Sequence, residues 1–157
     1  LFAQNVVGLV ASTRDSEMTS YVSLTRPGLK VAAAVPGLPL GRYTEYTFLR
    51  MSGLMRTGFR VVRGIRENIV VHPTDERDVL ARVIAGEADA GFVYATDIEA
   101  GGSKVRALIL PDALSPRIPC MVAVVTRGAR HEQAAAFVES LTGDAGRSIM
   151  RRHGFLP

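Results

Sequence analysis

Short apolar runs alternate with amphipathic segments along the chain, and this alternation constrains the fold more than any other feature. The apolar runs predict strands at Phe2–Val10, Leu29–Ala34, Asn68–Val71, Ala90–Tyr94, Val105–Leu110 and Met121–Thr126. Segments with helical spacing of apolar residues predict helices at Arg42–Ser52, Asp75–Ala85, Gln133–Leu141 and Ala145–Arg152. Alternating strands and helices are typical of an α/β fold with a mostly parallel sheet flanked by helices.

Two of the predicted helices have a well-defined apolar face. In Asp75–Ala85 this face consists of Val79, Leu80, Val83 and Ile84. Gly86 follows directly and predicts the end of that helix. In Gln133–Leu141 the apolar side chains expected to face inward are Ala134, Phe137, Val138 and Leu141.

Length and composition restrict the classes of function. A chain of 157 residues forms one domain or two small lobes. The net charge of +4 comes from dispersed arginines without interleaved aromatic residues, so we expect no nucleic-acid partner. Cys120 is the sole cysteine, which excludes an intrachain disulfide and predicts a buried, inert thiol. No apolar run approaches the length of a membrane span.

The stretch PGLPLGRYTEY, residues 36–46, places two prolines and two glycines directly before a predicted helix. Pro39 presets the backbone for a first helical turn, and Gly41 allows close approach of a neighbour or a ligand. The first amides, near Leu40 to Arg42, have no acceptor within the helix and lie at the positive end of its dipole. The stretch is therefore either an anion site or a tight turn that only redirects the chain.

Two further segments offer hydrogen-bond donors near the expected ends of strands. In HPTDERD, Thr74 is the expected N-cap, and Asp75 and Glu76 complement the helix dipole. The segment is structurally complete without a ligand, and the alternative is that its first amides meet the same anion as those near Gly41. Tyr94 ends an apolar strand, where its hydroxyl either faces a crevice or lies in water beside the core.

Residues that would indicate catalysis are scattered. His72, His131 and His153 lie far apart, and none has the spacing of metal ligands. The chain contains no nucleophile elbow, phosphate-binding loop or dinucleotide fingerprint. We therefore expect a binding protein rather than an enzyme, with no catalytic residue, no metal and no cofactor.

Taken in order, several segments resemble one family across nearly the whole chain. They are FAQNVVGLV, RPGLKVAAAVPGLPLGRYTEYTF, TDERDVLARVIAGEADAGFVYATD, PCMVAVV and AAAFVESLTGDAGRSIMRRHGF. The sequence resembles the periplasmic molybdate-binding proteins of ABC importers, which are type II periplasmic solute receptors. The most specific features are a P-x-G-x-Y element (Pro39, Gly41, Tyr43), the segment GEADAGFVYATD and a closing G-x-x-I-x-x-x-G-F pattern from Gly146 to Phe155.

The resemblance implies a fold, a ligand and partners. The fold would be periplasmic-binding-protein-like, and the ligand a tetrahedral oxyanion, molybdate or tungstate, held between two lobes by neutral donors. The site residues would be Leu40, Gly41, Glu76 and Tyr94, with the amides near Leu40 and of Glu76 and the Tyr94 hydroxyl as donors. The protein would be periplasmic or otherwise extracytoplasmic, although the chain contains no signal peptide, and would deliver its ligand to the membrane permease of an ABC importer.

The chain also departs from the family pattern. The family usually has alanine where this chain has Leu40, and a small apolar residue where it has Glu76. Its serine donors lie in an N-terminal segment upstream of anything in this sequence. We therefore expect residues 3–117 to form the complete second lobe and residues 118–157 to form the C-terminal part of the first. Such a chain would hold half a site, and its exposed apolar surface would allow a homodimer.

Other functions remain open from the sequence. One is a receptor for a different anion, such as sulfate, phosphate or a small organic acid, which the departures at Leu40 and Glu76 make credible. Another is the ligand-sensing domain of a transcriptional regulator or a cytosolic sensor, since such domains share the two-lobe α/β plan.

Overall fold

A computed structural model describes residues 1–156 of the chain. The chain divides into two compact units. Val6–Pro116 forms the larger unit, and Leu1–Asn5 together with the residues from Arg117 onward forms the smaller one.

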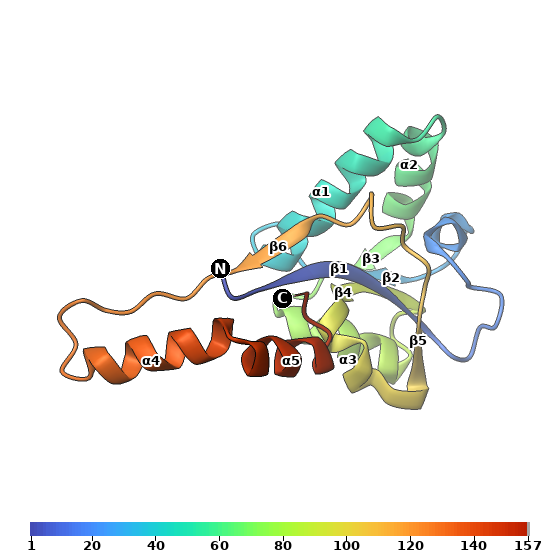
Figure 1. The fold of residues 1–157 in the computed structure, drawn as a ribbon. Helices are drawn as coiled ribbons and strands as arrows, with labels where there is room; N and C mark the ends of the chain where they lie inside the picture. Colours follow the sequence, from blue (N-terminus) through green and yellow to red (C-terminus); the bar gives the residue numbers. More distant parts are fainter. Residues whose placement is uncertain (157) are drawn as a thin grey trace. The chain divides into compact units, whose positions relative to one another are not determined.

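The larger unit is built on a mixed sheet (Figure 1). Its strands are β1 (Ala3–Ser12), β2 (Val31–Ala32), β3 (Ile69–Val71), β4 (Ala90–Tyr94) and β5 (Val105–Ala107), in the order β3-β2-β4-β1-β5. Strand β2 is parallel to β3 and β4, whereas β1 is antiparallel to β4 and β5. The predicted α/β architecture is confirmed, but the sheet is mixed rather than mostly parallel. The sequence did not reveal the direction of β1, because apolar periodicity reports burial and carries no information on strand direction.

Helices cover both faces of this sheet. Successive side chains of a strand point to opposite faces. Phe92 of β4 packs edge-on against Phe48, with ring centroids 5.2 Å apart. A Cβ on the preceding residue, Gly91, would lie 2.8 Å from Val79. The helices that carry Phe48 and Val79 therefore lie on opposite faces of β4.

Three helices belong to the larger unit. They are α1 (Pro39–Leu54), α2 (Gly58–Asn68) and α3 (Glu76–Ala85). Helix α1 begins at Pro39, three residues before the predicted range Arg42–Ser52, because the proline presets the first turn, and α3 ends as predicted at Gly86, which has a φ of 80°. Helix α2 is absent from the sequence prediction, and it lies beside α1 (Figure 1). The N-cap of α3 is Asp75 rather than the predicted Thr74, because the Asp75 side chain accepts a hydrogen bond from the Arg77 amide at 2.8 Å.

Three 3₁₀ helices complete the larger unit. They are η1 (Tyr21–Thr25), η2 (Ala95–Asp97) and η3 (Glu99–Lys104). Helix η2 follows β4 directly, so the chain turns immediately after Tyr94. Among residues 1–156, no helix combines the length and apolar character that a bilayer crossing requires.

The smaller unit contains β6 (Arg117–Cys120), α4 (His131–Thr142) and α5 (Asp144–Arg152). Strand β6 pairs with β1, and the Phe2 amide donates to the Cys120 carbonyl at 3.0 Å. The thiol of Cys120 is partly exposed rather than buried as predicted, and partial burial raises its pKa.

Two predictions for the smaller unit are wrong. Residues Met121–Thr126 are not a strand, because they pair with no other strand among the described residues, and Met121 and Val125 are 69% and 74% exposed. Helix α4 forms, but it has no buried residue, and Phe137 is 60% exposed rather than inward-facing. Within residues 1–156, the apolar face of α4 therefore lacks the packing partner that its periodicity predicts.

Candidate functional site

Three of the residues that the sequence singles out meet at the side chain of Glu76. The Leu40 amide donates a hydrogen bond to Glu76 Oε1 at 2.7 Å. The Tyr94 hydroxyl donates to the same oxygen at 3.2 Å. The three residues come from the start of α1, the start of α3 and the end of β4. One carboxylate oxygen therefore receives two donors from segments far apart in the sequence.

The Leu40 amide is available because α1 does not cap its own first turn. The N-cap residue, Leu38, makes no side-chain hydrogen bond, and the first turn contains no acidic residue. Pro39 has no amide hydrogen, so Leu40 carries the first amide hydrogen of the helix. Glu76, 36 residues further along the chain, supplies the missing acceptor and places a negative charge at the positive end of the α1 dipole.

The side chain of Leu40 belongs to the core. It is completely buried, in a cluster that also contains Ala34 of the loop before α1 and Val79 of α3. The leucine therefore occupies space inside the unit and leaves its amide free for Glu76.

Packing within the protein explains the glycine at position 41 without a ligand. A Cβ at this position would lie 2.1 Å from the Val35 carbonyl oxygen and 2.6 Å from the Ala34 carbonyl oxygen. Only glycine allows α1 to approach this backbone so closely. Gly41 also lines a hollow of ≈ 160 Å³, which His72 lines as well.

At the start of α3, the side chain of Glu76 has a role that the sequence analysis did not foresee. The expectation concerned its amide, which lies in the first turn of α3 and has no acceptor within that helix. The next amide of this first turn, that of Arg77, already bonds to Asp75. A signal that could have revealed the acceptor is the lack of any acidic or capping residue at the start of α1, which leaves its amides in need of one.

The surroundings keep the Tyr94 hydroxyl protonated. Burial raises the pKa of Tyr94 well above its ordinary value, and the charge of Glu76 and its hydrogen bond raise that pKa further. Burial also raises the pKa of Asp97, against the opposing effect of Arg77 and with a smaller contribution from Glu76. Tyr94 is therefore a hydrogen-bond donor at all physiological pH values.

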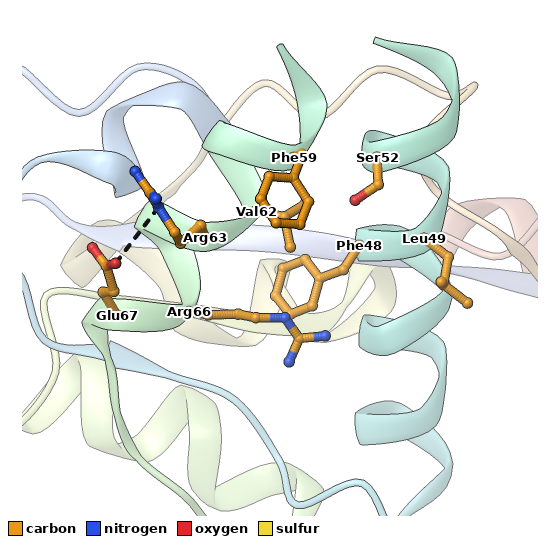
Figure 2. Close-up of a pocket in the computed structure, with 8 residues that line it drawn as sticks. All are labelled: Phe48, Leu49, Ser52, Phe59, Val62, Arg63, Arg66 and Glu67. Carbon is orange, nitrogen blue, oxygen red and sulfur yellow. Dashed lines mark ion pairs between the residues drawn. The ribbon is translucent and has the colours of Figure 1, made fainter. Parts of the chain in front are cut away.

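A separate hollow lies between α1 and α2 (Figure 2). It measures ≈ 490 Å³ and is lined by Phe48, Leu49, Ser52, Phe59, Val62, Arg63, Arg66 and Glu67. The Arg66 guanidinium lies over the Phe48 ring at 4.7 Å, and Arg63 pairs with Glu67 at 3.7 Å. None of Leu40, Gly41, Glu76 and Tyr94 lines this hollow.

Within residues 1–156, no group of three or more histidine, cysteine, aspartate or glutamate residues is placed to hold a metal ion. His131 is exposed at the start of α4, and His153 follows α5. His72 follows β3 and is likewise exposed. The candidate site is thus a cluster of hydrogen-bonding groups around one carboxylate.

Comparison with known proteins decides the family. Residues 2–156 match the family described as bacterial extracellular solute-binding protein. This chain belongs to that family. A curated relative in this family is the molybdate-binding protein ModA of Mycobacterium tuberculosis, strain H37Rv, which is 33% identical over 155 residues. The match covers 98% of this chain and 55% of the relative, so the chain spans about half the length of that solute-binding protein.

Solved structures in the comparison have the same fold. A substrate-binding domain of a putative molybdenum ABC transporter from Clostridium difficile superposes with a TM-score of 0.77 at 23% identity, covering 99% of this chain and 64% of the other. The sulfate-binding protein SubI from M. tuberculosis H37Rv superposes with a TM-score of 0.74 at 19% identity, covering 98% and 56%. The predicted periplasmic-binding-protein-like fold is confirmed. Its relatives are solute-binding proteins rather than enzymes, and membership of an extracellular family supports the predicted extracytoplasmic location.

Proposed function

We propose that this chain is part of an extracytoplasmic receptor that captures a tetrahedral oxyanion, molybdate or tungstate, and delivers it to the permease of an ABC importer. The observation that carries the proposal is the convergence of the Leu40 amide and the Tyr94 hydroxyl on one carboxylate oxygen. Two neutral donors that hold a negatively charged oxygen are the groups an oxyanion site requires. Similarity to a molybdate-binding protein supports the choice of ligand.

In this proposal the two units belong to two lobes. Residues 3–117 form the second lobe, which carries Leu40, Gly41, Glu76 and Tyr94, and residues 118–157 form the C-terminal part of the first. The exposed apolar side chains of Met121, Val125 and Phe137 support this assignment, since they suit burial against further parts of a lobe. The same exposed side chains would also allow a homodimer of this chain, which stays a prediction.

Sulfate is the second candidate ligand. The site carries an acidic residue at Glu76, with Asp97 close enough for the charge of Glu76 to affect its pKa. This negative charge penalises molybdate and sulfate alike, since both are dianions at neutral pH, so the surroundings of Glu76 do not favour molybdate over sulfate. A sulfate-binding protein also shares this fold.

A calorimetric titration tests the proposal. Molybdate, tungstate and sulfate are titrated separately into the longest form of the protein that the gene encodes and into the 157-residue chain alone. We expect the long form to bind molybdate and tungstate in preference to sulfate, and the short chain to bind them weakly. Binding of sulfate alone would replace molybdate with the second candidate, and absence of binding by all three anions would refute an oxyanion receptor.

A further inference from the structure

Glu76 stands where a ligand oxygen is expected. Its Oε1 atom accepts both the Leu40 amide and the Tyr94 hydroxyl, the donors proposed for an oxyanion. Each of these groups has a single hydrogen to donate, so it can serve only one strong acceptor at a time. An oxyanion and the Glu76 carboxylate therefore compete for the same two hydrogens.

The charges around Glu76 strengthen this competition. Its own helix begins with Asp75, Glu76 and Asp78, and Asp97 follows Tyr94 on the neighbouring segment. Arg77 is the positive group that acts on Asp97. An incoming dianion that left the Glu76 carboxylate in place would lie at hydrogen-bond distance from a like charge, which is unfavourable for both groups.

We propose that Glu76 sets the affinity of the site as an internal competitor: its carboxylate occupies the oxyanion position in the free protein, and a ligand binds only by displacing it. This inference rests on the proposed function. Displacement requires only that the side chain rotate away, since the Leu40 donor belongs to the backbone and Tyr94 lies at the end of a strand. A receptor that is competent only when this rotation has occurred binds with an apparent Kd raised by the inverse of the competent fraction.

Titration of molybdate into Glu76 variants of the longest form of the protein tests the inference. Glu76→Ala removes the occupant and is expected to lower the Kd about 10- to 100-fold, as for a competent state populated at about 1–10%. Glu76→Gln keeps the shape and an acceptor oxygen but loses the charge, so its Kd should fall between those of the wild type and Glu76→Ala. Circular dichroism verifies that each variant is folded.

Asp78→Asn is the matched control. Asp78 lies in the same first turn of α3, but its carboxylate pairs with Arg82 at 3.1 Å rather than with the Leu40 amide. Its neutralisation changes the local charge by the same amount and leaves the two donors occupied. We expect a change in Kd of less than about threefold, as for an exposed charge near a site. Equal gains from Asp78→Asn and Glu76→Ala would mean that charge alone acts, and would overturn the inference.

Hydrogen exchange of the Leu40 amide in the free protein is a second readout that needs no ligand. If Glu76 holds this amide, Glu76→Ala should accelerate its exchange at least about tenfold relative to the neighbouring helical amides. Unchanged exchange would overturn the inference whatever the affinities.

The failures of the inference and of the proposed function are distinguishable. If wild type and Glu76→Ala bind molybdate equally well, or if the variant binds more weakly, the inference fails while the oxyanion receptor stands. Weaker binding would mean that Glu76 contacts the ligand directly. If neither form binds molybdate, tungstate or sulfate, the proposed function fails and the inference fails with it.

Discussion

Phe48 of α1 and Phe92 of β4 pack edge to face, with an angle of 83° between their rings, and this contact fixes α1 on the sheet. Phe48 and Phe92 are both almost fully buried. The start of α1 carries the Leu40 amide and the end of β4 carries Tyr94, so the same two elements that form this contact also deliver both donors to Glu76.

Phe92→Ala should therefore destabilise the larger unit strongly. Removal of a buried phenylalanine costs about 3–5 kcal/mol in unfolding free energy, since the lost burial is compounded by a cavity. Urea denaturation measures this loss. Phe59→Ala is the control, because Phe59 is 73% exposed, and its change should stay within about 0.5 kcal/mol. Comparable losses in the two variants would contradict the assigned packing.

Gly41→Ala tests the close approach of α1 to the preceding loop. The added methyl group would lie 2.1 Å from the Val35 carbonyl oxygen, so the backbone must shift, at a cost of about 1–3 kcal/mol. Gly53→Ala, in the same helix, meets no atom within 4 Å and should stabilise the protein by about 0.5–1 kcal/mol. Thermal unfolding of both variants gives the comparison, and a stabilising Gly41→Ala would show that α1 does not pack on this backbone.

Tyr94→Phe tests the hydroxyl as a donor to the ligand. In wild type this hydroxyl exchanges one charged acceptor, Glu76, for another, so the test is made in the Glu76→Ala background, where no carboxylate holds it. There a hydrogen bond to a charged ligand contributes about 1.5–3 kcal/mol, so loss of the hydroxyl should weaken oxyanion binding about tenfold or more. Tyr46→Phe in the same background is the control, because Tyr46 is 48% exposed and its ring pairs with that of Tyr43, with centroids 5.9 Å apart. Titration of molybdate into both variants measures the effect. Equal affinities of Glu76→Ala with and without Tyr94→Phe would remove Tyr94 from the proposed site.

The raised pKa of Tyr94 adds a pH dependence to the same titration. Because burial and the charge of Glu76 raise this pKa, the hydroxyl keeps its proton above the pH at which an ordinary tyrosine ionises. Binding should therefore show no loss from tyrosine ionisation as the pH rises to about 10. A decline in Tyr94-dependent affinity already at pH 8–9, absent in Tyr94→Phe, would contradict the raised pKa.

The ion pair of Asp15 with Arg26 should make the free energy of unfolding decrease in acid. The hydrogen bond from Arg26 lowers the pKa of Asp15 in the folded protein. The unfolded state therefore binds more protons, so this contribution to stability is present above the ordinary pKa and is lost as the pH falls through the lowered one. Asp15→Asn should reduce the difference in urea midpoint between pH 7 and pH 3. The exposed Asp112 gives a control in Asp112→Asn, and an equal reduction in that variant would assign the effect to net charge.

The elements that the sequence predicts well are those whose signals are local. Pro39 begins α1 and Gly86 ends α3, because a fixed φ and a positive φ act within one residue. The sequence does not predict α2, although Val62 and Ile65 lie three residues apart on its buried face, because Gly58, Gly64 and the clustered arginines obscure the helical pattern. The segment Met121–Thr126 reads as a strand, yet a strand exists only where a partner pairs with it.

At the candidate site, too, local features could be predicted from the sequence and contacts between distant residues could not. The need of α1 for an acceptor is readable from PGLPLGRY, because the first amides of any helix lack one. Which residue satisfies that need is a property of three-dimensional packing, which brings Glu76 to a helix that starts 36 residues earlier. The resemblance to molybdate receptors singled out Leu40, Glu76 and Tyr94, which the structure brings together, while the acceptor role of the Glu76 side chain became visible only in the structure.

The Leu40 donor and the Glu76 acceptor differ in whether a point mutation can remove them. The Leu40 donor is a backbone amide, which every substitution except proline preserves. The acceptor is a side chain, and a single nucleotide change turns a glutamate codon into one for alanine, glycine or glutamine. Selection can therefore adjust how strongly such a receptor holds an anion, in either direction and in one mutational step, while the helices and the sheet stay as they are.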